Sequence, residues 1–111
     1  MKPIHMRKYK TPESVIRAIY RLWNDKRRWL QGPVAVTAEG RDTDPEDPTA
    51  CRVCLLGGLE RFTLTREVAS CALDLLWGVA CEGELSPVAI NEEQGYAAIR
   101  KLMRKALKGK V

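Results

Sequence analysis

The fold class is decided by the stretch Asp47-Pro48-Thr49-Ala50-Cys51-Arg52-Val53-Cys54-Leu55-Leu56-Gly57-Gly58-Leu59. Its first two residues are typical of a helix start, because aspartate is a favoured N-cap and proline is favoured at the first helical position. Apolar residues then recur with helical spacing at Cys51, Cys54, Leu55, Gly58, Leu59 and Phe62. The stretch predicts a helix that begins after Asp47 and whose cysteines pack in the core.

Two adjacent glycines, Gly57 and Gly58, interrupt this helix-forming pattern. Each lowers the helix propensity by about 1 kcal/mol relative to alanine. Their presence indicates that a neighbouring backbone passes close to this face, and we expect the neighbour to be the helix that follows in the chain.

Three further helices are predicted from apolar residues at a spacing of about 3.6. The first covers residues 11–32, between a Thr-Pro start and a Gly-Pro end. The next covers residues 65–79, where Trp77 adds a second apolar side, so we expect it to be the most buried helix. The last covers residues 91–107 and opens with Asn-Glu-Glu-Gln, which fits a capping box.

Two short segments, residues 34–38 and 86–90, are candidates for strands that pair with each other. The predicted architecture is mainly α, a compact four-helix domain with at most a minor two-stranded β element. We expect residues 1–111 to form a single domain, with residues 1–10 as a flexible basic N-terminal arm.

The composition is that of a globular chain, with 45% hydrophobic and 30% charged residues among 111. No run of about 18 apolar residues predicts a membrane span. The basic start of the chain lacks the apolar region of a secretory signal. We therefore expect a cytoplasmic protein with no membrane partner, whose four cysteines are reduced thiols.

The net charge of +5 is unevenly distributed. Residues 1–30 carry nine Lys or Arg against two acidic residues, and residues 94–111 carry six against none. The segments 31–60 and 61–93 each carry two basic residues against six acidic ones. Two basic ends flanking an acidic middle favour contacts with anionic partners through those ends.

The basic residues lie on the predicted faces of the first and last helices. Arg17, Arg21 and Arg28 share one face of the first helix with Asn24, and Lys26 and Arg27 lie nearby. Trp29 follows them and is a candidate for stacking on a base. The basic face of the last helix holds Arg100, Lys101, Arg104, Lys105 and Lys108. A solvated surface and a binding surface for phosphates or an acidic protein are both compatible with this pattern.

The spacing of Cys51 and Cys54 also suggests a metal, redox or nucleophilic site. A zinc site needs four converging ligands, but Cys71 and Cys81 would lie roughly 15 Å apart if one helix contained both. A nucleophilic Cys54 would need a base, and His5 is the only histidine. Core packing is the preferred interpretation, so we predict no catalytic residue, no metal and no cofactor.

Two motifs resemble a family of small uncharacterised bacterial and phage proteins, a domain of unknown function. They are the segments at residues 29–32, Trp-Leu-Gln-Gly, and 54–59, Cys-Leu-Leu-Gly-Gly-Leu, which are similar to that family's W-x-Q-G segment and C-L-L-G-A-L-like helix. The resemblance covers roughly residues 15–107 and implies a shared fold.

The sequence thus favours a non-enzymatic binding protein that acts through its basic helical faces. Its partner would be nucleic acid or a nucleic-acid-handling complex, in a phage or mobile-element accessory or inhibitor role. Two alternatives are a small cysteine-dependent enzyme centred on Cys54 and a protein–protein adaptor. The sequence does not predict an oligomeric state.

Overall fold

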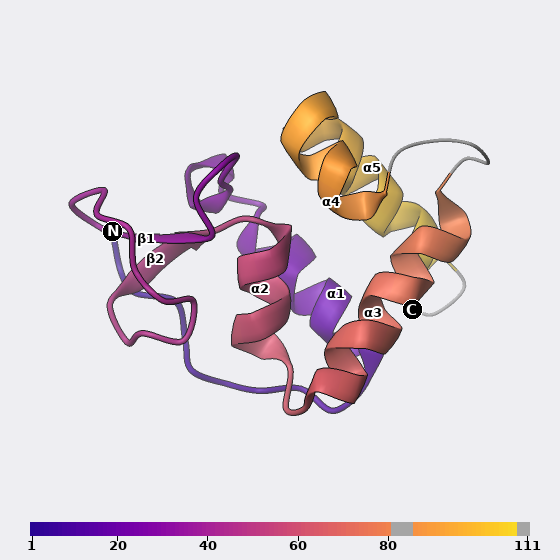
Figure 1. Ribbon diagram of the computed structural model, residues 1–111, viewed down its shortest axis with the longest axis horizontal. Coiled ribbons are helices and arrows are strands. Elements are labelled where there is room, and N and C mark those ends of the chain that lie inside the picture. The colour runs from indigo at the N-terminus through magenta and orange to yellow at the C-terminus, as the bar shows by residue number, and fades with distance from the viewer. Residues whose placement is uncertain (81–85, 109–111) are drawn as a thin grey trace.

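The computed structural model describes residues 1–80 and 86–108, and it is mainly helical with one small sheet at one end (Figure 1). The elements, in chain order, are α1 (Pro12–Leu22), the 3-10 helix η1 (Lys26–Arg28), β1 (Ala35–Thr37), β2 (Ala50–Val53), α2 (Leu55–Phe62), α3 (Arg66–Val79), α4 (Pro87–Ala89), the π-helix η2 (Ile90–Gln94) and α5 (Tyr96–Leu107). The two strands form an antiparallel sheet. The predicted fold class is confirmed, with the short α4 added to the four expected helices.

Helix α1 begins where the sequence predicts. The Thr11 hydroxyl accepts a hydrogen bond from the Ser14 amide, and Pro12 occupies the first turn. The prediction that this helix continues to residue 32 is wrong, because α1 ends at Leu22. Asp25 then accepts a bond from the Arg27 amide and starts η1. An aspartate side chain competes in this way for backbone donors that a continuing helix would need.

The stretch that decides the fold class is divided between a strand and a helix. Residues 50–53 form β2, paired with β1 in the register Ala35 to Val53. The Asp47 carboxylate accepts a bond from the Thr49 amide two residues on, which makes a turn instead of a helix cap. The N-cap of α2 is Cys54. The predicted start of this helix is therefore wrong by several residues, while its continuation to Phe62 is confirmed.

The sheet partner predicted for β1 is also wrong. Residues 34–38 do contain β1, but it pairs with β2 and not with residues 86–90. That second segment is helical, because the Ser86 hydroxyl caps the Ala89 amide and Pro87 lies in the first turn of α4. A serine–proline pair is a helix-start signal that outweighs the apolar Val88 and Ile90.

The two glycines of α2 do allow close packing, although α3 is not the neighbour. An ideal Cβ on Gly57 would lie 2.1 Å from the Val34 carbonyl oxygen, and one on Gly58 would lie 3.0 Å from the Ile19 side chain of α1. The expected close backbone approach is therefore correct for Gly57, and it comes from the segment leading into β1.

Helix α3 is less buried than predicted. Its buried residues are Ala72 and Leu76, whereas Trp77 is 54% exposed. Trp77 was expected to give α3 a second buried apolar side. That side is instead exposed to solvent, because the helix packs on the core along one side only.

The last helix begins later than predicted. Asn91 lies in η2 and not at a helix cap, and α5 starts after Gly95, whose φ of +93° lies in a region open mainly to glycine. The predicted apolar stripe of α5 is confirmed, because its members are all buried: Ile99, Leu102, Met103, Ala106 and Leu107.

Residues 1–10, predicted as a flexible basic arm, are hydrogen-bonded to the rest of the domain through Ile4 and Tyr9. Ile4 is buried and donates its amide to the Ala50 carbonyl at 2.9 Å, and the Tyr9 amide donates to the Phe62 carbonyl at 2.7 Å. The segment is further held by Arg61, which is 1% exposed.

The Arg61 guanidinium is the largest buried polar group of the core. It donates to the carbonyl oxygens of Pro45 at 2.9 Å, Asp47 at 2.5 Å, His5 at 3.3 Å and Ile4. Burial lowers the pKa of Arg61, and the nearby Asp47 carboxylate opposes that shift. One side chain thus joins α2, the N-terminal segment and the turn before β2.

Candidate nucleic-acid interface

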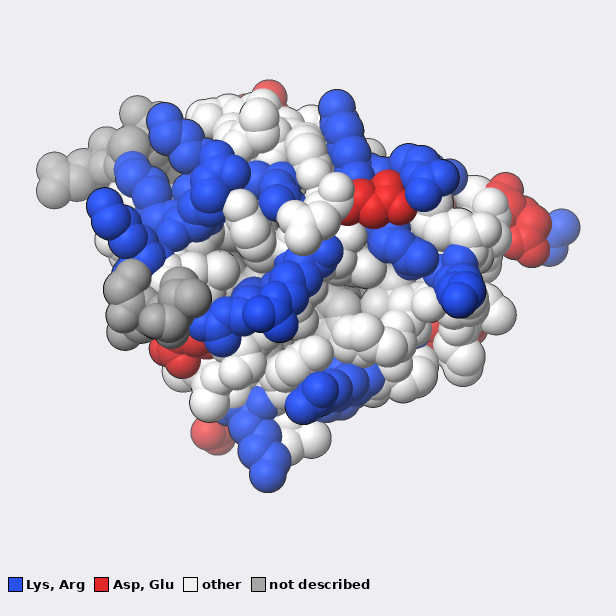
Figure 2. Space-filling view, turned by 180° about the vertical axis from the view of Figure 1, so that it is seen from behind, with Lys and Arg blue, Asp and Glu red and all other residues white. Residues whose placement is uncertain are grey.

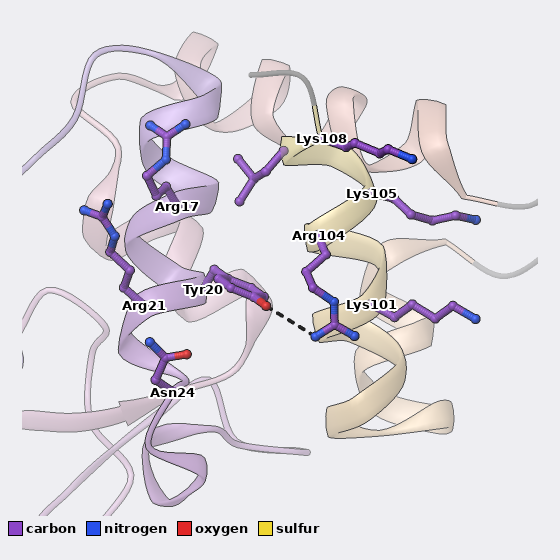
Figure 3. Close-up of a pocket in the computed structure, with 9 residues that line it drawn as sticks. Arg17, Tyr20, Arg21, Asn24, Lys101, Arg104, Lys105 and Lys108 are labelled. Atoms are coloured by element: carbon purple, nitrogen blue, oxygen red, sulfur yellow. Dashed lines mark hydrogen bonds between the residues drawn. The ribbon is translucent and has the colours of Figure 1, made fainter. Parts of the chain in front are cut away.

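The predicted basic faces of α1 and α5 come together along one groove, which we call the α1–α5 groove (Figure 3). The two helices contact each other directly, and the groove has a volume of about 710 Å³. The residues that line it are Arg17, Tyr20, Arg21, Asn24, Lys101, Arg104, Lys105, Leu107 and Lys108. Six of these nine residues are cationic, and none of the residues lining this described part of the surface is acidic.

Helical periodicity explains why these side chains share the groove. Residues 17, 20 and 21 follow the spacing i, i+3 and i+4 on α1, with residue 24 in the turn just after it, and residues 101, 104 and 105 repeat this spacing on α5, with residue 108 at its C-cap. Both helices bury their apolar faces in the same core. Their basic faces are therefore neighbours, and Figure 2 shows lysine and arginine side chains gathered over this side of the molecule.

Tyr20 and Leu107 supply the apolar part of the groove lining. Figure 3 shows Tyr20 extending from α1 toward α5, while Lys101 and Lys105 extend from the far side of α5. Arg17 and Arg21 lie on the other helix. The groove therefore has cations along both sides and an aromatic ring in the middle.

Two arginines of α5 fix Tyr20. The Arg100 guanidinium stacks 4.0 Å from the centre of the Tyr20 ring and donates to the Tyr20 carbonyl at 2.8 Å and to the Asn24 side-chain oxygen at 2.7 Å. Arg104 donates to the Tyr20 hydroxyl at 3.3 Å. Arg100 thus joins the two helices, and the Tyr20 hydroxyl keeps its own proton available for an acceptor in the groove.

The side chains of the groove are suited to anions. Lysine and arginine carry donors and no acceptors, and a depression lined by charges of one sign raises the local concentration of the opposite sign. The hydrogen bond from Arg104 is the main cause that lowers the pKa of Tyr20 from its ordinary value of 10.0, and the positive charge of Arg100 acts in the same direction.

A spectrophotometric titration tests this environment. Ionised tyrosine absorbs near 295 nm, so subtracting the curve of Tyr20→Phe from that of the native protein isolates the ionisation of Tyr20. We expect a midpoint below pH 10.0, because the cations favour the anionic phenolate. Arg104→Gln is expected to move the midpoint upward toward 10.0, and a midpoint that does not respond to this substitution would contradict the assigned contact.

The other residues predicted for this surface lie outside the α1–α5 groove. Arg27 forms an ion pair with Asp25 at 2.8 Å, and Arg28 donates to the Cys51 carbonyl at 3.1 Å. The Lys26 amino group lies 5.4 Å from the centre of the Tyr96 ring. Arg28 was expected to share the face of Arg17 and Arg21, with Lys26 and Arg27 nearby, but α1 ends at Leu22, before all three residues.

Trp29 is held by contacts within the fold. Its indole N–H donates to the Asn91 side-chain oxygen at 2.8 Å, and its ring meets the Tyr96 ring edge-on at 5.6 Å. Asn91 is 1% exposed and donates in turn to the Leu30 carbonyl. These contacts favour a role for Trp29 in fixing the segment after η1 against η2, in place of the predicted stacking on a base.

Sequence reasoning missed Tyr20 as a residue of the site. The signal was present, because Tyr20 lies three residues after Arg17 and four before Asn24 on the same helix face. A tyrosine at such a position is equally typical of the edge of the core. Only the position of α5 shows that Tyr20 lines the groove.

Cys54 lacks the surroundings of a nucleophile. It is 5% exposed, its sulfur accepts the Gly57 amide at 3.5 Å, and burial raises its pKa. A reactive thiol needs a lowered pKa and a base. The single histidine, His5, packs against Phe62 with ring centres 5.2 Å apart. The Gln31 side-chain amide donates to the carbonyl oxygens of Asn91 and Glu92, and the Asn91 side-chain amide donates to the Glu92 carboxylate.

The described cysteines also differ in their exposure to solvent. Cys51 and Cys54 are buried, whereas Cys71 is exposed on α3, and Cys81 lies outside the described residues. Within residues 1–80 and 86–108, no three His, Cys, Asp or Glu side chains are grouped so that they could hold a metal ion.

Comparison with known proteins adds no assignment. No family model, curated protein or solved structure matches this chain. The resemblance of residues 29–32 and 54–59 to a family of uncharacterised proteins therefore stays a prediction. In the described part of the chain, no helix has both the length and the apolar character required to cross a membrane.

Proposed function

We propose that the protein is a non-enzymatic binding protein whose α1–α5 groove holds the phosphate backbone of a nucleic acid. The observation that carries the proposal is that six of the nine residues lining one groove between two helices are cationic. Mutual repulsion of these charges disfavours such clustering in the absence of a partner. A polyanion supplies many phosphates at a spacing of a few ångströms, which suits several cations at once.

A cytoplasmic location and an accessory role in a phage or mobile element are part of the same proposal. The accessory role is supported by the family resemblance of residues 29–32 and 54–59. The groove supports the proposal of an anionic partner, whereas the accessory role rests on the resemblance alone.

The salt dependence of binding tests the proposal. The groove is about 10 Å long and a stacked strand carries one phosphate per about 3.4 Å, so about three phosphates are neutralised and the logarithm of the binding constant should fall with a slope of about −2 against the logarithm of salt concentration. The affinity for a fluorescent 20-nucleotide oligomer should then drop about 20-fold between 50 and 200 mM salt. Absence of binding at 50 mM salt would exclude the proposal.

Removal of two lysines tests whether the α1–α5 groove is the binding site. Lys101→Gln with Lys105→Gln changes two exposed residues of the groove, and we expect about tenfold weaker binding and a slope reduced by about 1.5. The matched control is Arg41→Gln with Arg66→Gln, which removes the same charge at exposed positions outside the groove. Equal losses in both variants would indicate a general charge effect without a site.

A further inference from the structure

We propose that the α1–α5 groove selects single-stranded over double-stranded nucleic acid by taking an unpaired base onto its apolar centre. This inference rests on the proposed function and specifies the form of the partner. It follows from the shape of the groove, from the distribution of charge along it and from the chemistry of its central residues.

The first argument is the shape of the surface. The proteins that read the base edges of a duplex insert an element such as a helix into its major groove. The basic residues of this chain instead surround a depression of about 710 Å³ between two packed helices. A depression receives a chain whose bases are free to turn toward the protein, and such bases are available in a single strand.

The second argument is the apolar centre. Contacts to duplex phosphates use charged and polar donors, and an aromatic ring face or an aliphatic side chain opposite a phosphate gives no compensating bond. Here Tyr20 and Leu107 line the same groove as the cations of the two helices, and Figure 3 shows Tyr20 extending from α1 toward α5. Grooves for single strands combine the same two features, a cationic path for the backbone and aromatic side chains for the bases.

The third argument is the rigidity of the aromatic ring. Tyr20 is held by the stacked Arg100 guanidinium at 4.0 Å and by the hydroxyl contact with Arg104 at 3.3 Å. A ring that is already fixed loses little conformational entropy when a base packs on it. Both arginines also supply positive charge at the point where the backbone of the bound strand would pass.

The extent of the site follows from the helix geometry. Residues 17–24 and 101–108 each span about 10 Å at a rise of about 1.5 Å per residue. A stacked strand advances about 3.4 Å per nucleotide, so the described groove accommodates about three nucleotides. One of them would place its base at Tyr20.

The test compares three ligands of equal length and label at 50 mM salt: an oligo(dT) 12-mer, the same strand with abasic positions throughout, and a 12-base-pair duplex. We expect oligo(dT) to bind about 5- to 150-fold more tightly than the abasic strand, which is the usual contribution of one stacked base. The duplex should also bind more weakly than oligo(dT), although it carries more phosphates.

Two substitutions test whether Tyr20 causes the preference for oligo(dT) over the abasic strand. Tyr20→Ala should reduce the preference for oligo(dT) over the abasic strand, whereas Tyr20→Phe, which keeps the ring, should retain it. The ligand comparison on the native protein keeps the inference testable if Tyr20→Ala folds poorly. Polyglutamate is the competitor for a purely electrostatic or acidic-protein site, and equal displacement of oligo(dT) by polyglutamate at equal charge would overturn the inference.

The outcomes separate the two proposals. Duplex binding equal to or tighter than oligo(dT) binding would overturn the selection for single strands while leaving nucleic-acid binding in place. Absence of binding by all three ligands would overturn both.

Discussion

Arg61→Met is expected to lower the free energy of unfolding by about 3–5 kcal/mol. The native guanidinium donates to four backbone carbonyl oxygens from the N-terminal segment and the turn before β2. A charge-assisted hydrogen bond contributes about 1.5–3 kcal/mol, and each carbonyl left buried without a donor adds a further cost. Urea unfolding followed by circular dichroism measures the difference.

Two substitutions control this measurement. Arg66→Met removes an exposed arginine at the start of α3, and we expect a change within about 0.5 kcal/mol. Arg61→Lys keeps the positive charge but loses the fork geometry that reaches several carbonyls at once, so its loss should be smaller than that of Arg61→Met. An Arg61→Met protein as stable as the native one would show that water or another donor replaces the guanidinium.

Gly57→Ala is expected to destabilise the protein by about 3 kcal/mol. The added methyl group would lie 2.1 Å from the Val34 carbonyl oxygen, far inside van der Waals contact. That oxygen accepts the Cys54 amide at 3.1 Å, so the backbone before β1 cannot move away without weakening the start of α2. The higher helix propensity of alanine, worth about 1 kcal/mol, offsets only part of this cost.

The neighbouring glycine provides the control for Gly57→Ala. A methyl group at Gly58 would meet Cγ1 and Cδ1 of the Ile19 side chain at 3.0 Å, and a side chain shifts more easily than a hydrogen-bonded backbone. The gain in helix propensity then nearly balances the contact. We therefore expect Gly58→Ala to change the stability by less than about 1 kcal/mol, and similar losses at both positions would contradict the backbone contact at Gly57.

Local signals predicted the helical parts of the fold where the signal and the packing agree. Thr11-Pro12 starts α1, and the apolar stripe of α5 is buried as its spacing indicates. The segment 47–53 shows the limit of this reasoning. Its apolar residues fit a helical period, but pairing with β1 satisfies its backbone as a strand. Such pairing joins segments about fifteen residues apart, which a local pattern does not record.

The candidate site was predicted in part. Helical spacing placed Arg17 and Arg21 on one face and the lysines of α5 on another, and both placements are confirmed by the groove. That the two faces adjoin follows from tertiary packing and was not predictable from either helix alone. Arg28 was assigned to the face of Arg17 and Arg21 only because α1 was expected to continue past Leu22. Arg61 was overlooked, since an arginine near an apolar stripe reads as an exposed charge.

The chain uses arginine in two physically different ways, and ionic strength distinguishes them. Arg61 bonds to uncharged carbonyl groups in the interior, where mobile ions screen poorly. The arginines and lysines of the α1–α5 groove face solvent, and their contacts with phosphates would weaken steeply as salt is added. If the proposed function is correct, washing with concentrated salt during purification should release bound nucleic acid, seen as a falling ratio of absorbance at 260 to 280 nm, from a protein that stays folded.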